Sequence, residues 1–561
     1  GFSDVRSGGA DAAALANRLL RDLDRTAGPV IYAAARDRAG ALDGPRVMGC
    51  GGGHDALGNA RPPDRSPVAE ALPRLAGRVR GVAVCAMFAA RNPAHELAAQ
   101  AAVARLTGLP AALSHELSAR LDAPRRALTT VMNARLIPII ARLIADTEGF
   151  LARRGIAAPL VVVRGDGSLV AAAFARARPG ETILSGPAAS VVGARALSGL
   201  DEAFISDIGG TTTDVACLEG GRPRIDPAGA TVGGLRTLVE AVEMRTFGLG
   251  GDSELTLIPD AAGARLDFGP RRILPLSLAA AQHEAAVVGH LEALAALPDA
   301  GRPAPRMLLR LTQDAPGLTP AEAAVLDRVG AGPVPAGAAV ARATDRAAVD
   351  RLVRRGVLQV AGFTPTDAAH VLGRQATFHA GAARIGAALL AATRDGRGLP
   401  VAEDAEAFAD RGLTAFTRRS AEVVLETAFA EDGHDGAAAV AGRLVAEALD
   451  GRRGRVRVTV ALDRPVVGVG ASAGLHYAGL PALLGVPCHV PGNADVANAV
   501  GAVVGQVSVR ADVTVTQPSE GLYRVALPDG PRDLPDEDAA LRLAEEAAAR
   551  RARDLALAAG A

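Results

Sequence analysis

The stretch ISDIGGTTTDVACLEGG (residues 205–221) decides how the rest of the chain is interpreted. It places Gly209 and Gly210 between two aspartates, Asp207 and Asp214. The flanking runs AFISDI and TDVACL are strand-like, and the glycines between them favour a tight turn. The pattern therefore predicts two antiparallel strands joined by a short connection.

The tip of this hairpin carries the groups that a phosphate-binding loop needs. Glycines let the backbone turn sharply and approach a ligand, and successive N–H groups then form an anion-binding concavity. Asp207, at the strand end, is placed to hold Mg²⁺ directly or through water, while Asp214 orients water, holds metal or fixes the loop. We predict Asp207 and Asp214 as catalytic residues, and nucleotide contacts from Gly209, Gly210, Thr211, Thr212 and Thr213. The alternative is a plain hairpin whose polar side chains only satisfy turn hydrogen bonds.

The order D-x-G-G-T-x-x-D between two strands resembles the phosphate loop of the actin, sugar kinase and Hsp70 ATPase superfamily. The surrounding segments narrow the match to the A-subunit type of the hydantoinase/oxoprolinase family, which the chain resembles over most of residues 50–260 and again over 464–505. The segments that carry this resemblance are RNPAHE (91–96), HELSARLDAPRRALTTVMNARLIP (115–138), GDGSL (165–169), SGPAASVVGA (185–194) and FGLGGDSEL (247–255).

The resemblance implies ATP-dependent opening of a cyclic amide such as 5-oxoproline or a hydantoin. Phosphorylation of the amide oxygen makes the ring carbon electrophilic, and water then attacks it. ATP and Mg²⁺ are the implied cofactors, and a B-type subunit is the implied partner in a hetero-oligomer. Related carboxylases phosphorylate the enol of a ketone, so a ketone carboxylase-type subunit is an alternative.

A departure from the family supports a third hypothesis, a nucleotide-binding subunit without catalytic activity. Members carry a first phosphate loop near the amino terminus, whereas the opening GFSDVRSGGADAAALANRLL (residues 1–20) has no such loop. We therefore expect the first ATPase domain to be incomplete.

Two further Gly-rich segments are candidate nucleotide contacts. GLGGDSE (248–254) includes Gly250 and Gly251, and by resemblance borders the nucleotide or substrate cleft. GVGASAG (468–474) includes Gly470 and Ala471, and resembles the strand-to-helix turn that packs on adenosine in this superfamily. Each is otherwise an ordinary turn, since a lone Gly-rich loop is a weak signal.

Histidines next to acidic residues form a second set of candidates, at His54-Asp55, His95-Glu96 and His115-Glu116. Adjacent side chains point in different directions, so one such pair rarely chelates a metal, but histidines from separate loops could meet. We name His54 and His115 as candidate ligands of an additional divalent metal. The alternative is that they are structural.

For two further segments the sequence allows both a binding role and a structural role. Arg125 and Arg126 either neutralise phosphate or a substrate carboxylate, or form an exposed pair. SGPAAS (185–190) either offers backbone N–H groups to an anion or simply starts a helix.

The composition excludes some function classes. Basic and acidic residues balance at 61 each, so nothing indicates binding to nucleic acid or to an anionic membrane. This argues against a DNA-binding regulator, although residues 318–373 have a winged-helix-like pattern. All basic residues are arginine, which excludes a Schiff-base lysine and a P-loop lysine. Four scattered cysteines without CxxC spacing fit a reducing cytoplasm, and no run of about 18 apolar residues predicts a membrane span.

Strands alternating with helices predict an α/β protein. By resemblance we expect actin-like ATPase (ribonuclease-H-like) domains with a mainly helical insertion. The expected boundaries are 1–125 for the remainder of the first domain, 126–300 for the second ATPase domain, 301–450 for the insertion and 451–561 for the return to α/β structure.

Overall fold

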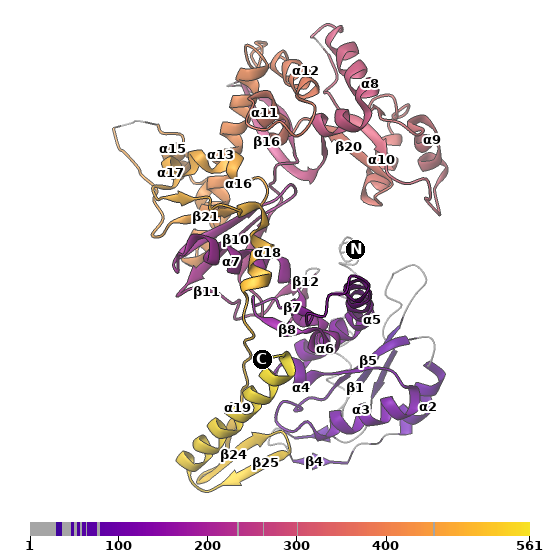
Figure 1. The fold of residues 1–561 in the computed structure, drawn as a ribbon, viewed down its shortest axis with the longest axis vertical. Coiled ribbons are helices and arrows are strands. Elements are labelled where there is room, and N and C mark those ends of the chain that lie inside the picture. Colours follow the sequence, from indigo (N-terminus) through magenta and orange to yellow (C-terminus); the bar gives the residue numbers. More distant parts are fainter. Residues whose placement is uncertain are drawn as a thin grey trace. The chain divides into compact units, whose positions relative to one another are not determined.

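The computed structural model describes residues 30–35, 46–49, 53–55, 59–62, 64, 66–75, 79–232, 235–261, 263–299, 301–452 and 455–561. The chain divides into two units (Figure 1). Unit 1 comprises Gly1–Gly193, Pro223–Glu243 and Asn498–Ala561, and unit 2 comprises Ala194–Arg222 and Met244–Ala497. Residues 1–20 and Cys50 lie outside the described residues.

The first sheet of unit 1 has the strand order β2-β1-β5-β6. β1 (Val30–Ala35) runs antiparallel to β2 (Arg46–Gly49) and to β5 (Val79–Cys85), whereas β6 (Ala111–Leu113) runs parallel to β5. The apolar runs at 28–34 and 81–88, which are strand-like in the sequence, thus lie largely in β1 and β5. Because alternate residues of a strand face opposite sides, β5 supplies apolar side chains to two helical layers.

Helices cover both faces of this sheet. Val82 and Val84 pack with Val103 of α3 (Ala94–Thr107) on one face, and Ala83 and Cys85 pack against α5 (Ala123–Arg153) on the other. The remaining short elements nearby are β3 (Gly53–His54), β4 (Ala60–Arg61), α2 (Ser66–Leu75) and α4 (Ser114–Leu117).

Helix α5 begins at a side-chain cap, because the carboxylate of Asp122 accepts the backbone N–H of Arg125. It ends before Gly155, which has φ +69°. Among the described helices, α5 alone is long and apolar enough to cross a membrane by length and composition, and 50% of its apolar window is buried in the structure. A core helix meets the same test, and the first half of α5 packs on β5.

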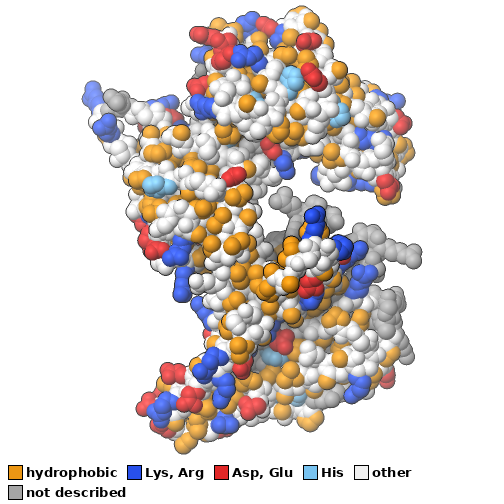
Figure 2. Space-filling view, in the orientation of Figure 1, with side chains coloured by type: hydrophobic (Ala, Val, Ile, Leu, Met, Phe, Trp, Pro, Cys, Tyr) orange, Lys and Arg blue, Asp and Glu red, His pale blue; other side chains and the backbone are white. Residues whose placement is uncertain are grey.

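The rest of unit 1 combines segments from three parts of the chain. C-terminal helix α19 begins after Asp536, which caps it, and packs on the last three-stranded sheet. The remaining elements of unit 1 are β7 (Val161–Val163), β8 (Leu169–Ala171), α6 (Ala172–Ala177), η2 (Pro179–Thr182), α7 (Ser185–Ser198, which continues into unit 2), β12 (Thr231–Val232), β13 (Leu235–Arg236), α18 (Ala497–Val504), β23 (Val515–Ser519), β24 (Leu522–Leu527), β25 (Gly530–Leu534) and α19 (Glu537–Ala559). Figure 2 shows basic and acidic side chains interspersed over β24, β25 and α19.

The main sheet of unit 2 has the order β11-β10-β9-β21-β22, with β14 also paired to β10. β9 (Ala203–Ile208) and β10 (Thr213–Glu219) are antiparallel, as predicted, and β21 (Val466–Val469) runs parallel to β9. Helix α13 (Ala405–Glu431) packs on this sheet through Phe416 and Val424. The other strands are β11 (Arg222–Pro223), β14 (Met244–Phe247) and β22 (Cys488–His489).

The second part of unit 2 contains a long hairpin, a four-stranded sheet of order β17-β20-β18-β19, and several helices. Thr319 and Glu322 have the spacing of a capping box in the sequence, and that box is present at the start of α9. The elements of this part are β15 (Ser253–Asp260), β16 (Gly263–Arg272), β17 (Leu274–Pro275), α8 (Leu276–Ala295), β18 (Met307–Arg310), α9 (Pro320–Val329), β19 (Val334–Pro335), α10 (Asp345–Arg354), β20 (Leu358–Gly362), α11 (Pro365–Val371) and α12 (Ala380–Ala391). Short elements that lie with the main sheet are α14 (Gly436–Ala441), α15 (Arg443–Leu449), α16 (Ala473–His476), η3 (Tyr477–Gly479), α17 (Leu480–Leu484) and η4 (Ala494–Val496).

Two sequence-based expectations differ from this architecture. The boundary at 125/126 falls inside α5, which packs on β5, so residues 126–193 belong with unit 1. The run RVRVTVAL (455–462) alternates as a strand does and so predicts one, but this prediction is wrong: its residues have no ladder partner, and Val456 is 76% exposed. An alternating pattern alone does not supply a neighbouring strand.

Candidate functional site

The hairpin of residues 205–221 forms the centre of the site. Asp207 and Asp214 are directly opposite each other in the β9–β10 ladder. The turn between the strands closes with the N–H of Gly209 donating to the carbonyl of Thr212 at 3.0 Å. Both aspartates are half-buried, and Gly209 and Gly210 remain partly accessible. The turn therefore presents its backbone beside two carboxyl groups.

The segment 248–252 packs directly on this turn. The N–H of Gly251 donates to the carbonyl of Gly209 at 3.0 Å, and that of Asp252 donates to the carbonyl of Gly210 at 2.8 Å. A Cβ on Gly250 would lie 2.5 Å from the carbonyl carbon of Gly210. Only a glycine permits this approach, so Gly250 brings the two loops together.

The turn after β21 lies against the end of β9, next to Asp207. Val469 pairs with Asp207 in the parallel ladder, and Gly470 follows with φ +94°. A Cβ on Gly470 would lie 2.4 Å from Asp207 Oδ1 and 2.5 Å from the carbonyl oxygen of Ile208. Ala471, next in the chain, is exposed. Three Gly-rich loops far apart in sequence thus meet around Asp207.

The three threonines of the turn differ in their surroundings. Thr213 is fully buried, and its hydroxyl donates to the carbonyl of Leu249 at 2.7 Å. Thr211 is exposed and Thr212 is half-buried. Among the hydrogen bonds of the described residues, none involves either of their hydroxyl groups. Thr213 therefore fixes the hairpin to the 248–252 segment, whereas Thr211 and Thr212 are the threonines available to a ligand.

The carboxyl group of Asp214 is held by the neighbouring strand. The hydroxyl of Thr246 on β14 donates to Asp214 Oδ1 at 2.6 Å. Burial raises the pKa of Asp214 above its usual value, the charge of Asp207 raises it further, and the Thr246 hydrogen bond opposes both effects. A perturbed carboxyl group beside a Gly-rich loop is a common feature of functional sites.

Sequence reasoning missed two residues of this region. The hydroxyl of Thr366, at the start of α11, donates to the carbonyl of Gly251 at 2.9 Å. The guanidinium of Arg272 on β16 pairs with Asp252 at 3.1 Å, and its Nη2 would lie 3.6 Å from a Cβ on Gly210. The side chain of Arg272 is 58% exposed and places a positive charge beside the turn. Neither residue lies in a motif, so no signal in the sequence marked them.

The histidine candidates lie in unit 1, where His54 and His115 have different partners. In the part of the chain that the structure describes, no three His, Cys, Asp or Glu side chains come together as metal ligands. His54 stacks on His95 at 3.9 Å between ring centroids, and burial lowers the pKa of His54 to about 4. His115 instead pairs with Glu96 at 2.6 Å.

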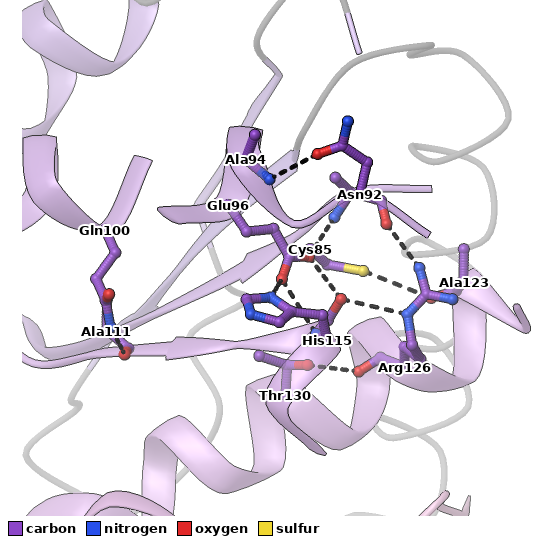
Figure 3. A network of polar contacts seen from close by, with 12 residues as sticks. Cys85, Asn92, Ala94, Glu96, Gln100, Ala111, His115, Ala123, Arg126 and Thr130 are labelled. Atoms are coloured by element: carbon purple, nitrogen blue, oxygen red, sulfur yellow. Dashed lines mark hydrogen bonds and ion pairs between the residues drawn. The ribbon is translucent and has the colours of Figure 1, made fainter. Parts of the chain in front are cut away.

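Arg125 and Arg126 do not form an exposed pair, because Arg126 is buried. Arg126, labelled in Figure 3, is 1% exposed. It donates to the carbonyls of Ala86 and Met87 at 2.6 Å and 2.7 Å. Arg125 donates to the carbonyl of Thr237 at 3.0 Å. Both guanidinium groups therefore donate to backbone carbonyls near the start of helix α5.

Comparison with known protein families supports the family resemblance that the order of the sequence motifs indicated. The hydantoinase/oxoprolinase family model matches residues 126–510.

The chain belongs to the hydantoinase/oxoprolinase family.

Relatives within reach of sequence comparison include the caprolactamase subunit alpha of Pseudomonas jessenii, 30% identical over 198 residues, which are 35% of this chain and 28% of the relative. An uncharacterised protein of Methanocaldococcus jannaschii is 26% identical over 148 residues, which are 26% of this chain and 22% of that protein.

Two solved structures share the fold. A nucleotide-free acetone carboxylase aligns with a TM-score of 0.52 and 16% identity over 93% of this chain and 61% of that chain. The ATP-dependent caprolactamase of Pseudomonas jessenii aligns with a TM-score of 0.51 and 21% identity over 83% of this chain and 54% of that chain. The chain thus has a mixed α/β fold of this kind and spans less than two thirds of the length of each of these proteins.

Proposed function

We propose that the chain binds Mg-ATP at the β9–β10 turn and acts as the A-type subunit in ATP-dependent hydrolysis of a cyclic amide. The observation that carries this proposal is the meeting of three Gly-rich loops around Asp207, at positions where a Cβ would collide with the neighbouring loop. Backbone N–H groups in such a cradle suit a phosphate chain. Family membership and a relative named as a caprolactamase subunit support the choice of a cyclic amide.

The residues present fit the proposed ligand. The partly accessible backbone of Gly209 and Gly210 and the hydroxyls of Thr211 and Thr212 would contact phosphate oxygens. Asp207 and Asp214 are the carboxylates that would hold Mg²⁺ or its bound water, and a hard oxygen-ligated cation matches that donor type. Mg²⁺ supplies neutralisation of phosphate charge, and Arg272 adds a positive charge from the protein.

The chemistry needs little from the protein beyond positioning and charge. Transfer of the γ-phosphoryl group from ATP to the amide oxygen makes the ring carbon electrophilic and leaves ADP. Attack by water and cleavage of the C–N bond then open the ring to an acyl phosphate, and a second water hydrolyses this to the carboxylate and inorganic phosphate. Donors fixed before reaction are worth more than mobile ones, because they need no reorganisation in the transition state. The packing of Gly250 and Gly470 against the turn holds its backbone in this way.

Release of inorganic phosphate from Mg-ATP tests the proposal. The 561-residue chain is assayed alone and with a B-type family subunit, without substrate and with caprolactam, 5-oxoproline or hydantoin. We expect release stimulated by one of these amides and abolished in Asp207→Ala. Asp267→Asn, on the exposed part of β16, is the matched control and keeps wild-type activity.

Other outcomes separate the competing functions. Stimulation by acetone with bicarbonate, and not by any amide, indicates a ketone carboxylase-type subunit, a possibility consistent with the shared fold. ATP binding without turnover, even with the partner, indicates a nucleotide-binding subunit that is not itself catalytic. Absence of ATP binding would refute the nucleotide site itself.

A further inference from the structure

Unit 1 contains a cavity that the nucleotide proposal does not use. It has a volume of about 300 Å³, and its wall includes His115 of α4, Arg178 after α6 and Arg551 of α19. Glu116, Asp512 and Leu555 also line it. All of these residues belong to unit 1. The volume suits a small organic molecule.

The imidazole of His115 is held by a buried carboxylate. Nδ1 of His115 lies 2.6 Å from Glu96 Oε2, and Glu96 is fully buried. Because a carboxylate only accepts hydrogen bonds, Nδ1 is the protonated nitrogen and Nε2 carries the free lone pair. Among the described residues no hydrogen bond reaches Nε2, and the side chain keeps 13% of its surface exposed.

Glu96 is itself fixed, so the orientation of the imidazole is fixed with it. Oε1 of Glu96 accepts the N–H of Ala86 at 2.7 Å and the hydroxyl of Ser114 at 2.6 Å (Figure 3). The backbone N–H of His115 donates to Oε2 at 3.1 Å. A buried carboxylate that accepts a hydrogen bond from one ring nitrogen of a histidine fixes the orientation of the ring and leaves the other nitrogen facing the ligand.

Two arginines of the same cavity lack a close acidic partner. Among the described residues no carboxylate lies within ion-pair distance of Arg551, and Arg178 reaches only Glu181, at 3.8 Å. Glu181 is shared with Arg164, whose Nε lies 3.0 Å from it. Burial lowers the pKa of Arg551, and the charge of Arg178 lowers it further, although Asp512 and Glu116 oppose this at longer range. Two partly buried guanidinium groups that repel each other form a site for an anion.

We propose that this cavity binds a small organic carboxylate that also carries a hydroxyl or amino group. Arg178 and Arg551 hold the carboxylate, and Nε2 of His115 accepts the hydrogen bond from the hydroxyl or amino donor. Planar guanidinium groups match a carboxylate, and the acidic side chains of Glu116 and Asp512 disfavour a dianion such as phosphate. Leu555 and Val239 supply apolar contacts for the carbon chain.

Titration calorimetry on the full chain tests this site with two probes that differ in one hydroxyl, 4-hydroxybutanoate and butanoate. We expect both to bind with one-to-one stoichiometry, and 4-hydroxybutanoate to bind more tightly. Arg551→Gln should weaken both by about tenfold or more, since a charge-assisted contact is lost. Arg550→Gln, an exposed neighbour on α19, is the matched control and should change neither.

The role of His115 is tested by the difference in affinity between 4-hydroxybutanoate and butanoate. His115→Gln should remove the advantage of 4-hydroxybutanoate while leaving butanoate binding nearly unchanged. In the wild-type protein, 4-hydroxybutanoate should shift the ¹⁵N resonance of Nε2 of His115, a readout that does not depend on any variant folding. Binding of inorganic phosphate but not of either carboxylate, no saturable binding of the carboxylates, or equal effects of Arg551→Gln and Arg550→Gln would each overturn the proposal.

Discussion

Gly470 and Asp207 are so close that a Cβ on the glycine would lie 2.4 Å from the Oδ1 atom of the aspartate. These residues are far apart in sequence, and the parallel pairing of β21 with β9 brings them together. The backbone of Gly470 has φ +94°, which L side chains rarely adopt. The position therefore demands glycine for two independent reasons, and both act at the centre of the proposed nucleotide site.

Gly470→Ala should destabilise unit 2 and abolish ATP binding. The added methyl group meets the carbonyl oxygen of Ile208 at 2.5 Å, and backbone cannot move aside as a flexible side chain can. Strain of this kind costs on the order of 1–3 kcal/mol. Urea denaturation measures the loss, and a fluorescent ATP analogue measures binding.

Gly474→Ala is the control for this variant. Gly474 lies in α16, and no atom is within 4 Å of its Cβ position. Alanine in a helix favours folding by up to about 1 kcal/mol relative to glycine. Equal loss of stability in both variants would contradict the role of the close approach to Asp207.

Asp214→Asn should make the protein more stable at neutral pH. Burial raises the pKa of Asp214, so the folded protein binds this proton more tightly than the unfolded chain does. Ionisation of Asp214 therefore lowers the free energy of unfolding as the pH rises from the unfolded pKa through the raised folded pKa. Asparagine keeps an acceptor for the Thr246 hydroxyl and carries no charge.

The gain from Asp214→Asn should consequently be larger at pH 7 than at pH 4, where the wild-type carboxyl group is more often protonated. Urea denaturation at the two pH values measures it. The same variant should bind Mg-ATP more weakly, since the proposed site loses a carboxylate. A stability gain that does not change with pH would show that ionisation of Asp214 is not its cause.

Arg126→Leu should destabilise unit 1 severely. The guanidinium is 1% exposed and donates to the carbonyls of Ala86, Met87 and Arg120. Its removal leaves the carbonyl of Met87 without its donor and that of buried Ala86 with only the N–H of Ala89, at 3.3 Å. A buried acceptor left without a good partner costs about 1–3 kcal/mol. Thermal and urea denaturation measure the effect.

Arg142→Leu on the same helix is the matched comparison. Its side chain is 85% exposed and pairs with Asp146 at 3.9 Å, an arrangement worth less than about 1 kcal/mol. A similar small effect for both variants would show that Arg126 does not hold the loops before α3 and α5 in place.

The local features of this protein were accessible from sequence because neighbours in the chain produce them. The β9–β10 hairpin follows from two apolar runs around Gly209 and Gly210. The capping box of Thr319 and the terminal helix after Asp536 follow from contacts within one helical turn. The order of short motifs also placed the chain in its family.

Only the tertiary structure decided which polar side chains hydrogen-bond to each other, because residues that are distant in the sequence become neighbours in the fold. The sequence could not show that Arg126 turns inward to backbone carbonyls, or that His115 pairs with Glu96 rather than with another histidine. It could not show that the hydroxyl of Thr213 donates to the carbonyl of Leu249 and is therefore not available to a ligand. Each outcome depends on burial, because a polar side chain taken out of water must find a partner, and the folded chain determines which partner is within reach.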